Sequence, residues 1–152
     1  VTMRQIAVQA LSEIGSPGAL QALEKSIEDK DRDVRVAVVK TLGAKGYRGV
    51  FSRLENYVKG KALRDADLTE RMAFFEAYGA LCGDSGVPFL DELLNAKGMF
   101  GRREDPEMRA CAAIALGRIG THKANTSLRL AANEKDVVVR NAVNRAMRAG
   151  VV

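Results

Sequence analysis

The sequence predicts an all-α solenoid of about four and a half stacked helix pairs, because one helical pattern recurs five times. Each copy opens with an arginine, and apolar residues follow it at three and seven positions, on one helical face. Each copy also has a glycine near its end, where a helix C-cap in the left-handed conformation favours glycine. The arginines are Arg4, Arg35, Arg71, Arg109 and Arg140, and the glycines are Gly15, Gly46, Gly83, Gly120 and Gly150.

A second set of helices is expected between these five. Apolar residues three before and four after a central leucine give it a helical spacing. The triplets are Leu20/Leu23/Ile27, Phe51/Leu54/Val58, Val87/Leu90/Leu94 and, less apolar, Asn125/Leu128/Ala132. Capping signals mark helix starts at Ser16-Pro17, at Asp105-Pro106 and at Asp67, which has Glu70 three positions later.

The composition fits one helical domain over residues 1–152. Hydrophobic residues make up 47% of the chain and aromatic residues only 5%, which suits helices packed through Ala, Leu and Val. No apolar run is long enough to cross a bilayer, so no membrane insertion is expected. Two cysteines do not form a disulfide framework, which favours a reducing, cytoplasmic location.

The two ends of the chain differ in pattern. The first helix keeps a full apolar pattern, as if another repeat should cover it, which predicts the C-terminal fragment of a longer protein. The last helix has Asn144 where the other copies have an apolar residue, and this suits a terminal repeat.

The sixteen residues from Asp105 to Gly120 resemble a HEAT repeat, with the sequence DPEMRACAAIALGRIG. The resemblance is closest to the short bacterial subtype that also occurs in phycobilin-lyase subunits, and it extends over nearly the whole chain. It implies a right-handed superhelix in which the arginine-bearing helices line the concave surface. It does not specify a function, because the family includes scaffolds, adaptors, lyase subunits and DNA glycosylases.

The repeated arginines have a structural and a phosphate-binding interpretation, and the structural one is favoured. An aspartate stands four residues before four of the five arginines, at Asp31, Asp67, Asp105 and Asp136. An arginine near a helix N-terminus opposes the helix dipole, so a nearby carboxylate would offset it. The resemblance likewise implies a stacked Asp–Arg ladder between repeats.

No set of residues predicts catalysis, so the chain is interpreted as a non-enzyme without a cofactor or metal. The only histidine, His122, is expected on the surface, in the turn after a glycine. Cys82 and Cys111 stand at packing positions and are expected to be buried thiols. These three residues do not complete a structural zinc site.

Two insertions are candidate binding loops, because the arginine spacing grows from 31 residues to 36 and 38 where they occur. They are the segments 59–64 and 97–103, each between a second-set helix and the next arginine-bearing helix. We expect stacking to place them side by side on one basic rim. The proposed binding residues are Lys59, Lys61, Arg64, Lys97, Arg102, Arg103 and the apolar pair Met99-Phe100.

The concave surface is the second candidate. Positions one and five after each arginine are expected to point into the groove. They include an apolar strip of Val36, Met72, Ala110 and Ile114, flanked by Lys40, Glu76 and Arg145. An uncovered apolar strip predicts a bound peptide or helix.

These features favour a non-enzymatic scaffold or adaptor that holds a protein partner. The basic rim favours a partner with an acidic surface. Binding of nucleic acid or another polyanion is the alternative. Eleven basic and five acidic residues lie from Lys97 onward, so the net charge of +5 belongs to the C-terminal part. A lyase-like enzyme subunit is the third possibility.

Overall fold

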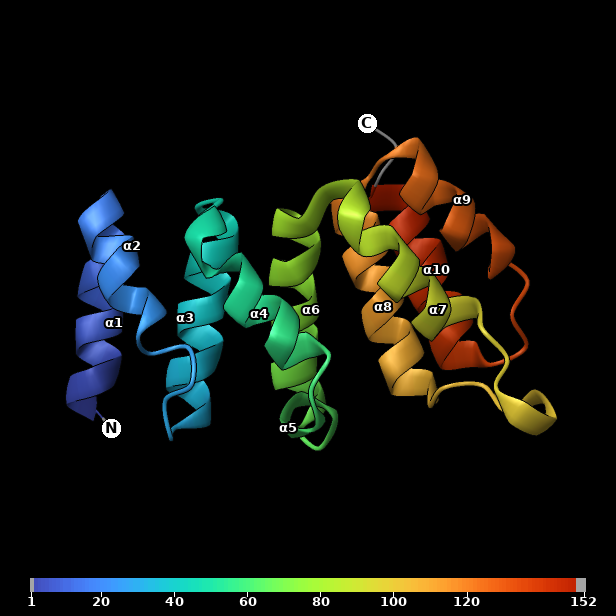
Figure 1. Cartoon of the computed structure of the whole chain (residues 1–152), viewed down its shortest axis with the longest axis horizontal. Helices are drawn as coiled ribbons and strands as arrows, with labels where there is room; N and C mark the ends of the chain where they lie inside the picture. Colours follow the sequence, from blue (N-terminus) through green and yellow to red (C-terminus); the bar gives the residue numbers. More distant parts are fainter. Residues whose placement is uncertain (1, 150–152) are drawn as a thin grey trace. The chain divides into compact units, whose positions relative to one another are not determined.

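The computed structural model describes residues 2–149, and every regular element in that range is a helix (Figure 1). The α-helices are α1 (Thr2–Ile14), α2 (Pro17–Glu24), α3 (Arg32–Ala44), α4 (Phe51–Val58), α5 (Lys61–Arg64), α6 (Leu68–Cys82), α7 (Val87–Asn95), α8 (Pro106–Ile119), α9 (His122–Leu130) and α10 (Val137–Ala149). Three 3-10 turns lie between them, η1 (Arg48–Val50), η2 (Gly83–Gly86) and η3 (Met99–Gly101). Over the described residues, none of these helices combines the length and apolar character that crossing a membrane requires.

The chain forms two compact units, Val1–Ala77 and Tyr78–Val152, which are described separately. In the first unit, α1 packs against α2 and α3, and α4 packs against α5. In the second unit, α8 packs against α7, α9 and α10. The helices α1 and α8 therefore each contact both the helix after them and the next arginine-bearing helix. The single domain, the right-handed superhelix and the number of repeats stay predictions.

The five arginine-bearing segments are the helices α1, α3, α6, α8 and α10, as the repeated pattern predicted. Four of the five glycines adopt the left-handed conformation, with φ of 62° at Gly15, 66° at Gly46, 58° at Gly83 and 68° at Gly120. A glycine has no Cβ to clash in this conformation, so it ends the helix at little cost. Gly150 lies outside the described residues.

Short polar side chains fix the helix starts, and they include all four aspartates singled out in the sequence. Asp31 accepts a hydrogen bond from the backbone N–H of Val34 at 3.0 Å, and Asp105 accepts one from Glu107 at 3.0 Å. Asp67 and Asp136 accept equivalent bonds from Glu70 and Val139. Ser16 caps α2, as predicted, with Pro17 as its first residue.

The second set of helices buries its central leucines completely. Leu23, Leu54, Leu90 and Leu128 each have zero relative exposure, which confirms that they are equivalent core positions. For Leu128, the two flanking apolar positions were predicted one residue too late along the chain, at Asn125 and Ala132. Ala124 and Ala131 are buried there, whereas Asn125 and Ala132 are half-buried, because α9 turns its smallest side chains toward its neighbours.

Small residues bring the arginine-bearing helices of the second unit close together. A Cβ added at Gly117 of α8 would lie 2.8 Å from the Cβ of Ala146 in α10, so glycine is required for the observed approach. Stacking at this distance leaves little room at the interface and lets the two helices share one core.

We expect Leu90→Ala to lower the free energy of unfolding by about 2–5 kcal/mol, because it removes a fully buried side chain and leaves a cavity. Leu130→Ala is the matched control, since Leu130 is 72% exposed in the same unit, and should change stability by less than about 0.5 kcal/mol. Urea denaturation of both variants measures the difference. Equal losses for the two leucines would contradict the assignment of the core.

Candidate partner-binding surfaces

The segment 97–103, called the basic loop from here on, forms a tight turn between α7 and α8 in the second unit. The backbone N–H of Gly98 donates to the carbonyl oxygen of Arg102 at 2.6 Å, and that of Gly101 donates to the Gly98 carbonyl at 3.1 Å. These two hydrogen bonds close the loop on itself. In Figure 1 it is the yellow turn that projects beyond the helices of its unit.

The tip of the basic loop carries two uncovered apolar side chains. Met99 is 83% exposed and Phe100 is 96% exposed, as the sequence predicted for this pair. Phe100 has a φ of 62°, in the left-handed region that a bulky residue rarely adopts. The closed turn thus holds an aromatic ring in water, at a cost in backbone strain and in exposed apolar surface.

The base of the basic loop is anchored to α7. The guanidinium of Arg103 donates to the carbonyl oxygen of Asn95 at 3.0 Å. The Asn95 amide in turn donates to Asp91 and to the backbone carbonyl of Ser127, at 2.8 and 3.0 Å. Lys97, Arg102 and Arg103 are all exposed, but Arg103 has this structural contact as well. It therefore shapes the loop in addition to adding charge.

The other insertion, segment 59–64, is more ordered than a surface loop. It contains the short helix α5, and its Leu63 is completely buried. Lys59 lies 3.8 Å from the carboxylate of Glu55, one turn earlier on the chain. Lys61 and Arg64 are exposed. The two insertions belong to different units, so their predicted side-by-side placement stays a prediction.

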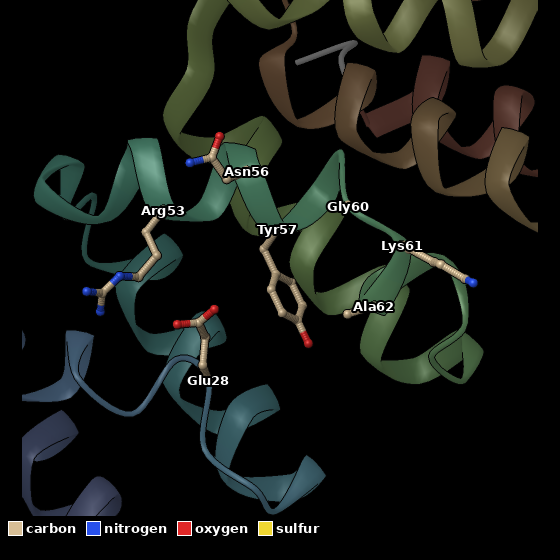
Figure 2. A pocket seen from close by; sticks show the side chains of 7 residues that line it. All are labelled: Glu28, Arg53, Asn56, Tyr57, Gly60, Lys61 and Ala62. Carbon is tan, nitrogen blue, oxygen red and sulfur yellow. The ribbon is translucent and has the colours of Figure 1, made fainter.

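Segment 59–64 also forms one wall of a pocket of about 310 Å³ in the first unit (Figure 2). Gly60, Lys61 and Ala62 line this wall. The other lining residues are Arg53, Asn56 and Tyr57 of α4 and Glu28, which precedes α3. No sequence pattern predicts this pocket, because it depends on how α5 folds back toward the turn before α3.

A buried network fixes the aromatic side of the pocket. The Tyr57 hydroxyl donates to Glu70 at 3.4 Å, and the guanidinium of Arg35 binds both oxygens of the same carboxylate, at 2.6 and 3.0 Å. The Tyr57 ring packs on Phe74 with 4.5 Å between centroids. Burial, together with the negative charge of Glu70, raises the pKa of Tyr57.

The predicted apolar strip is only partly available. Ala110 is 8% exposed and therefore offers little surface to a partner, and the binding role of the strip stays a prediction. Val36, Met72 and Ile114 are half-buried. The flanking charges Lys40, Glu76 and Arg145 are exposed.

Two of the repeated arginines, Arg4 and Arg109, bind carboxylates other than the predicted ones. Arg4 and Arg109 pair with the turn residues Asp29 and Glu134, at 3.0 and 2.8 Å, while the predicted aspartates cap helices. Each of these long side chains reaches the turn that precedes the next arginine-bearing helix, α3 for Arg4 and α10 for Arg109. The predicted Asp–Arg ladder is thus an arginine–turn ladder at these positions.

Each of these two turns is held by a second arginine as well. Arg35 donates to the backbone carbonyl of Asp29 at 2.8 Å, and Arg140 donates to that of Glu134 at 3.3 Å. Both acceptors stand six residues before the second arginine of the pair. An acidic residue at that spacing was the sequence signal for these partners, although Asp65 stands at the same spacing before Arg71, in a repeat with an insertion.

The remaining chemical candidates lie where the sequence placed them. His122 is exposed at the start of α9, and Cys82 and Cys111 are buried free thiols. Within residues 2–149, no three His, Cys, Asp or Glu side chains group as a metal site.

Two sets of helices alternate along the chain. The arginine-bearing helices are followed by left-handed glycines, and the second set buries its central leucines, which together define a helical-repeat protein. Residues 2–61 match a protein-family model described as HEAT repeats. Over these residues the chain is therefore similar to HEAT repeats, as its sequence predicted. A search of curated proteins finds no match to the chain.

The ion pair between Arg109 and Glu134 predicts a pH-dependent stability. The Arg109 guanidinium donates to Glu134 and holds the pKa of that carboxyl below its usual range. A lowered folded-state pKa stabilises the fold above the unfolded value of about 4.3, and this contribution is lost as the pH falls through the folded value. Glu134→Gln should therefore cost about 1–2 kcal/mol at pH 7 and nearly nothing at pH 2–3.

The control for this prediction is Glu92→Gln, since Glu92 is exposed on α7. It should match the parent to within about 0.5 kcal/mol at every pH. Denaturant unfolding across this pH range measures all three proteins. A Glu134→Gln deficit that persists at pH 2–3 would show that the ion pair is not its cause.

Proposed function

We propose that this chain is a non-enzymatic scaffold or adaptor that binds a protein partner through the basic loop. The Met99-Phe100 pair, displayed in water at the tip of a closed and anchored turn, is the observation that carries the proposal. An exposed aromatic ring costs solvation free energy, and burial against a partner recovers it. Protein binding is also the usual role of HEAT repeats, to which residues 2–61 are similar.

The chemistry around the tip favours an acidic partner. Lys97 and Arg102 are exposed beside Phe100 and add positive charge at the rim of the contact. Such charges steer an acidic surface toward the loop and increase the association rate, while a desolvated aromatic side chain slows dissociation. Because the turn is already closed, little conformational entropy is lost on binding.

We further propose that the chain forms one domain, a right-handed solenoid of about four and a half repeats of the short bacterial subtype. Its further contact residues would be Lys40, Glu76 and Arg145. Two buried free thiols support a reducing compartment, so the proposed location is the cytoplasm.

Affinity capture from a lysate of the source cell tests the proposal, with the parent chain and variants as parallel baits. Proteins that depend on the loop should be lost with Phe100→Ala and kept with Leu130→Ala, a matched exposed apolar residue of the same unit. They should remain at high salt, whereas bound nucleic acid would be released. Captured proteins that are unaffected by Phe100→Ala, or nucleic acid alone, would contradict the proposal.

Kinetics on a purified partner then separate the two contributions. We expect Phe100→Ala to speed dissociation, with a loss of about 1–2 kcal/mol in binding free energy. Arg102→Glu should instead slow association and flatten its salt dependence. Arg118→Glu is the charge control, because Arg118 is exposed on α8, outside the loop. The same effect from Arg102→Glu and Arg118→Glu would argue for non-specific charge attraction.

A further inference from the structure

The pocket of the first unit exists because of an insertion. The arginine spacing around segment 59–64 is 36 residues, against 31 in the repeats without one. The extra residues fold as α5, and Gly60, Lys61 and Ala62 form a wall that faces α4. A volume of about 310 Å³ is at the lower end for binding sites, enough to receive one side chain of a partner.

The Tyr57 ring forms a rigid aromatic surface in this pocket. Phe74 packs against the ring, and the hydroxyl is bonded to Glu70, so the orientation of the ring is set before any ligand arrives. Figure 2 shows the ring pointing from α4 into the space between Glu28 and Ala62. The face of a tyrosine ring carries negative electrostatic potential and attracts cations.

A carboxylate approaches the same space from the opposite side. Glu28 lines the pocket from the turn before α3, and Figure 2 shows its carboxylate pointing toward the region of the Tyr57 ring. Among residues 2–149, Glu28 has neither a hydrogen bond nor an ion pair to its side chain. It therefore offers both oxygens to a ligand.

The two cations of the lining do not converge on this space. The guanidinium of Arg53 donates to the carbonyl oxygen of Glu24 at 3.2 Å. In Figure 2 the Arg53 and Lys61 side chains extend to opposite sides, and the Lys61 ammonium group points away from the pocket. Neither arrangement forms a site for an anion, which would need donors directed at one point.

We propose that this pocket binds a cationic side chain of a partner polypeptide, arginine in preference to lysine. A planar guanidinium stacks on the Tyr57 ring and presents paired N–H donors to the Glu28 carboxylate, whereas an ammonium group makes only a point contact. The exposed ammonium group of Lys61 weakens this binding through repulsion, which salt partly screens. The site is independent of the basic loop, since it lies in the other unit, so either proposal can fail alone.

The test is a titration of the intact ¹⁵N-labelled chain with N-acetyl-arginine methylamide, followed by amide chemical shifts. We expect a Kd on the order of millimolar, with shifts centred on the amides of Glu28 and segment 56–62. The lysine counterpart should bind more weakly. The citrulline counterpart, which is neutral but has the same shape, and the aspartate counterpart should give no shifts there.

Variants identify the groups that bind. Glu28→Gln should weaken arginine binding about five-fold, since Glu28 is exposed and the change leaves the fold intact. Tyr57→Phe keeps the ring and should stay within about two-fold of the parent, whereas Tyr57→Leu should weaken binding about five-fold. Lys61→Met should strengthen binding about two-fold, because it removes a repelling charge. Glu92→Gln, in the second unit, is the control.

Several outcomes would overturn the proposal. Equal binding of the citrulline probe would show that charge plays no part. Shifts that spread over the surface, or an arginine affinity that is unchanged in Glu28→Gln, would place the arginine elsewhere. Aspartate binding at segment 56–62 would mean that Arg53 and Lys61 define the site instead.

Discussion

Arginine side chains hold the turns between successive helix pairs, and the arrangement of each unit depends on them. A turn that follows a helix leaves backbone carbonyls without partners, and arginine supplies several N–H donors in one planar group. Asp29 receives Arg4 on its carboxylate and Arg35 on its carbonyl, and Glu134 receives Arg109 and Arg140 in the same way. The turn is therefore fixed to both of the helices that it links in the stack.

The same device is adapted where the chain carries an insertion. Before α8, Arg109 donates to the carbonyl oxygen of Leu94 at 2.9 Å and Arg103 donates to that of Asn95, so the basic loop starts and ends at fixed points. In the first turn of α6, the buried Glu70 accepts hydrogen bonds from Arg35 and from the Tyr57 hydroxyl. Each insertion thus departs from an anchored turn, which lets it present side chains in a defined position.

The sequence predicted the helices well, because their signals are local. The apolar spacing, the caps and the left-handed glycines act within one or two turns of helix, so the leucines at Leu23, Leu54, Leu90 and Leu128 were assigned correctly. The partners of the arginines and the burial of Ala110 depend on contacts between helices. The wall formed by α5 depends on folding of an insertion without repeat equivalents, and no periodic pattern marks such a wall.

The central claim is that anchored turns present the insertions rigidly, so that binding needs little ordering. Backbone ¹⁵N relaxation of the free chain tests it most directly, because amide order parameters report motion on the picosecond-to-nanosecond timescale. If the loop is anchored in this way, we expect order parameters of about 0.8 or higher for the amides of segment 97–103, close to those of α7 and α8. Values below about 0.6 across this segment would show a flexible loop and would contradict the account.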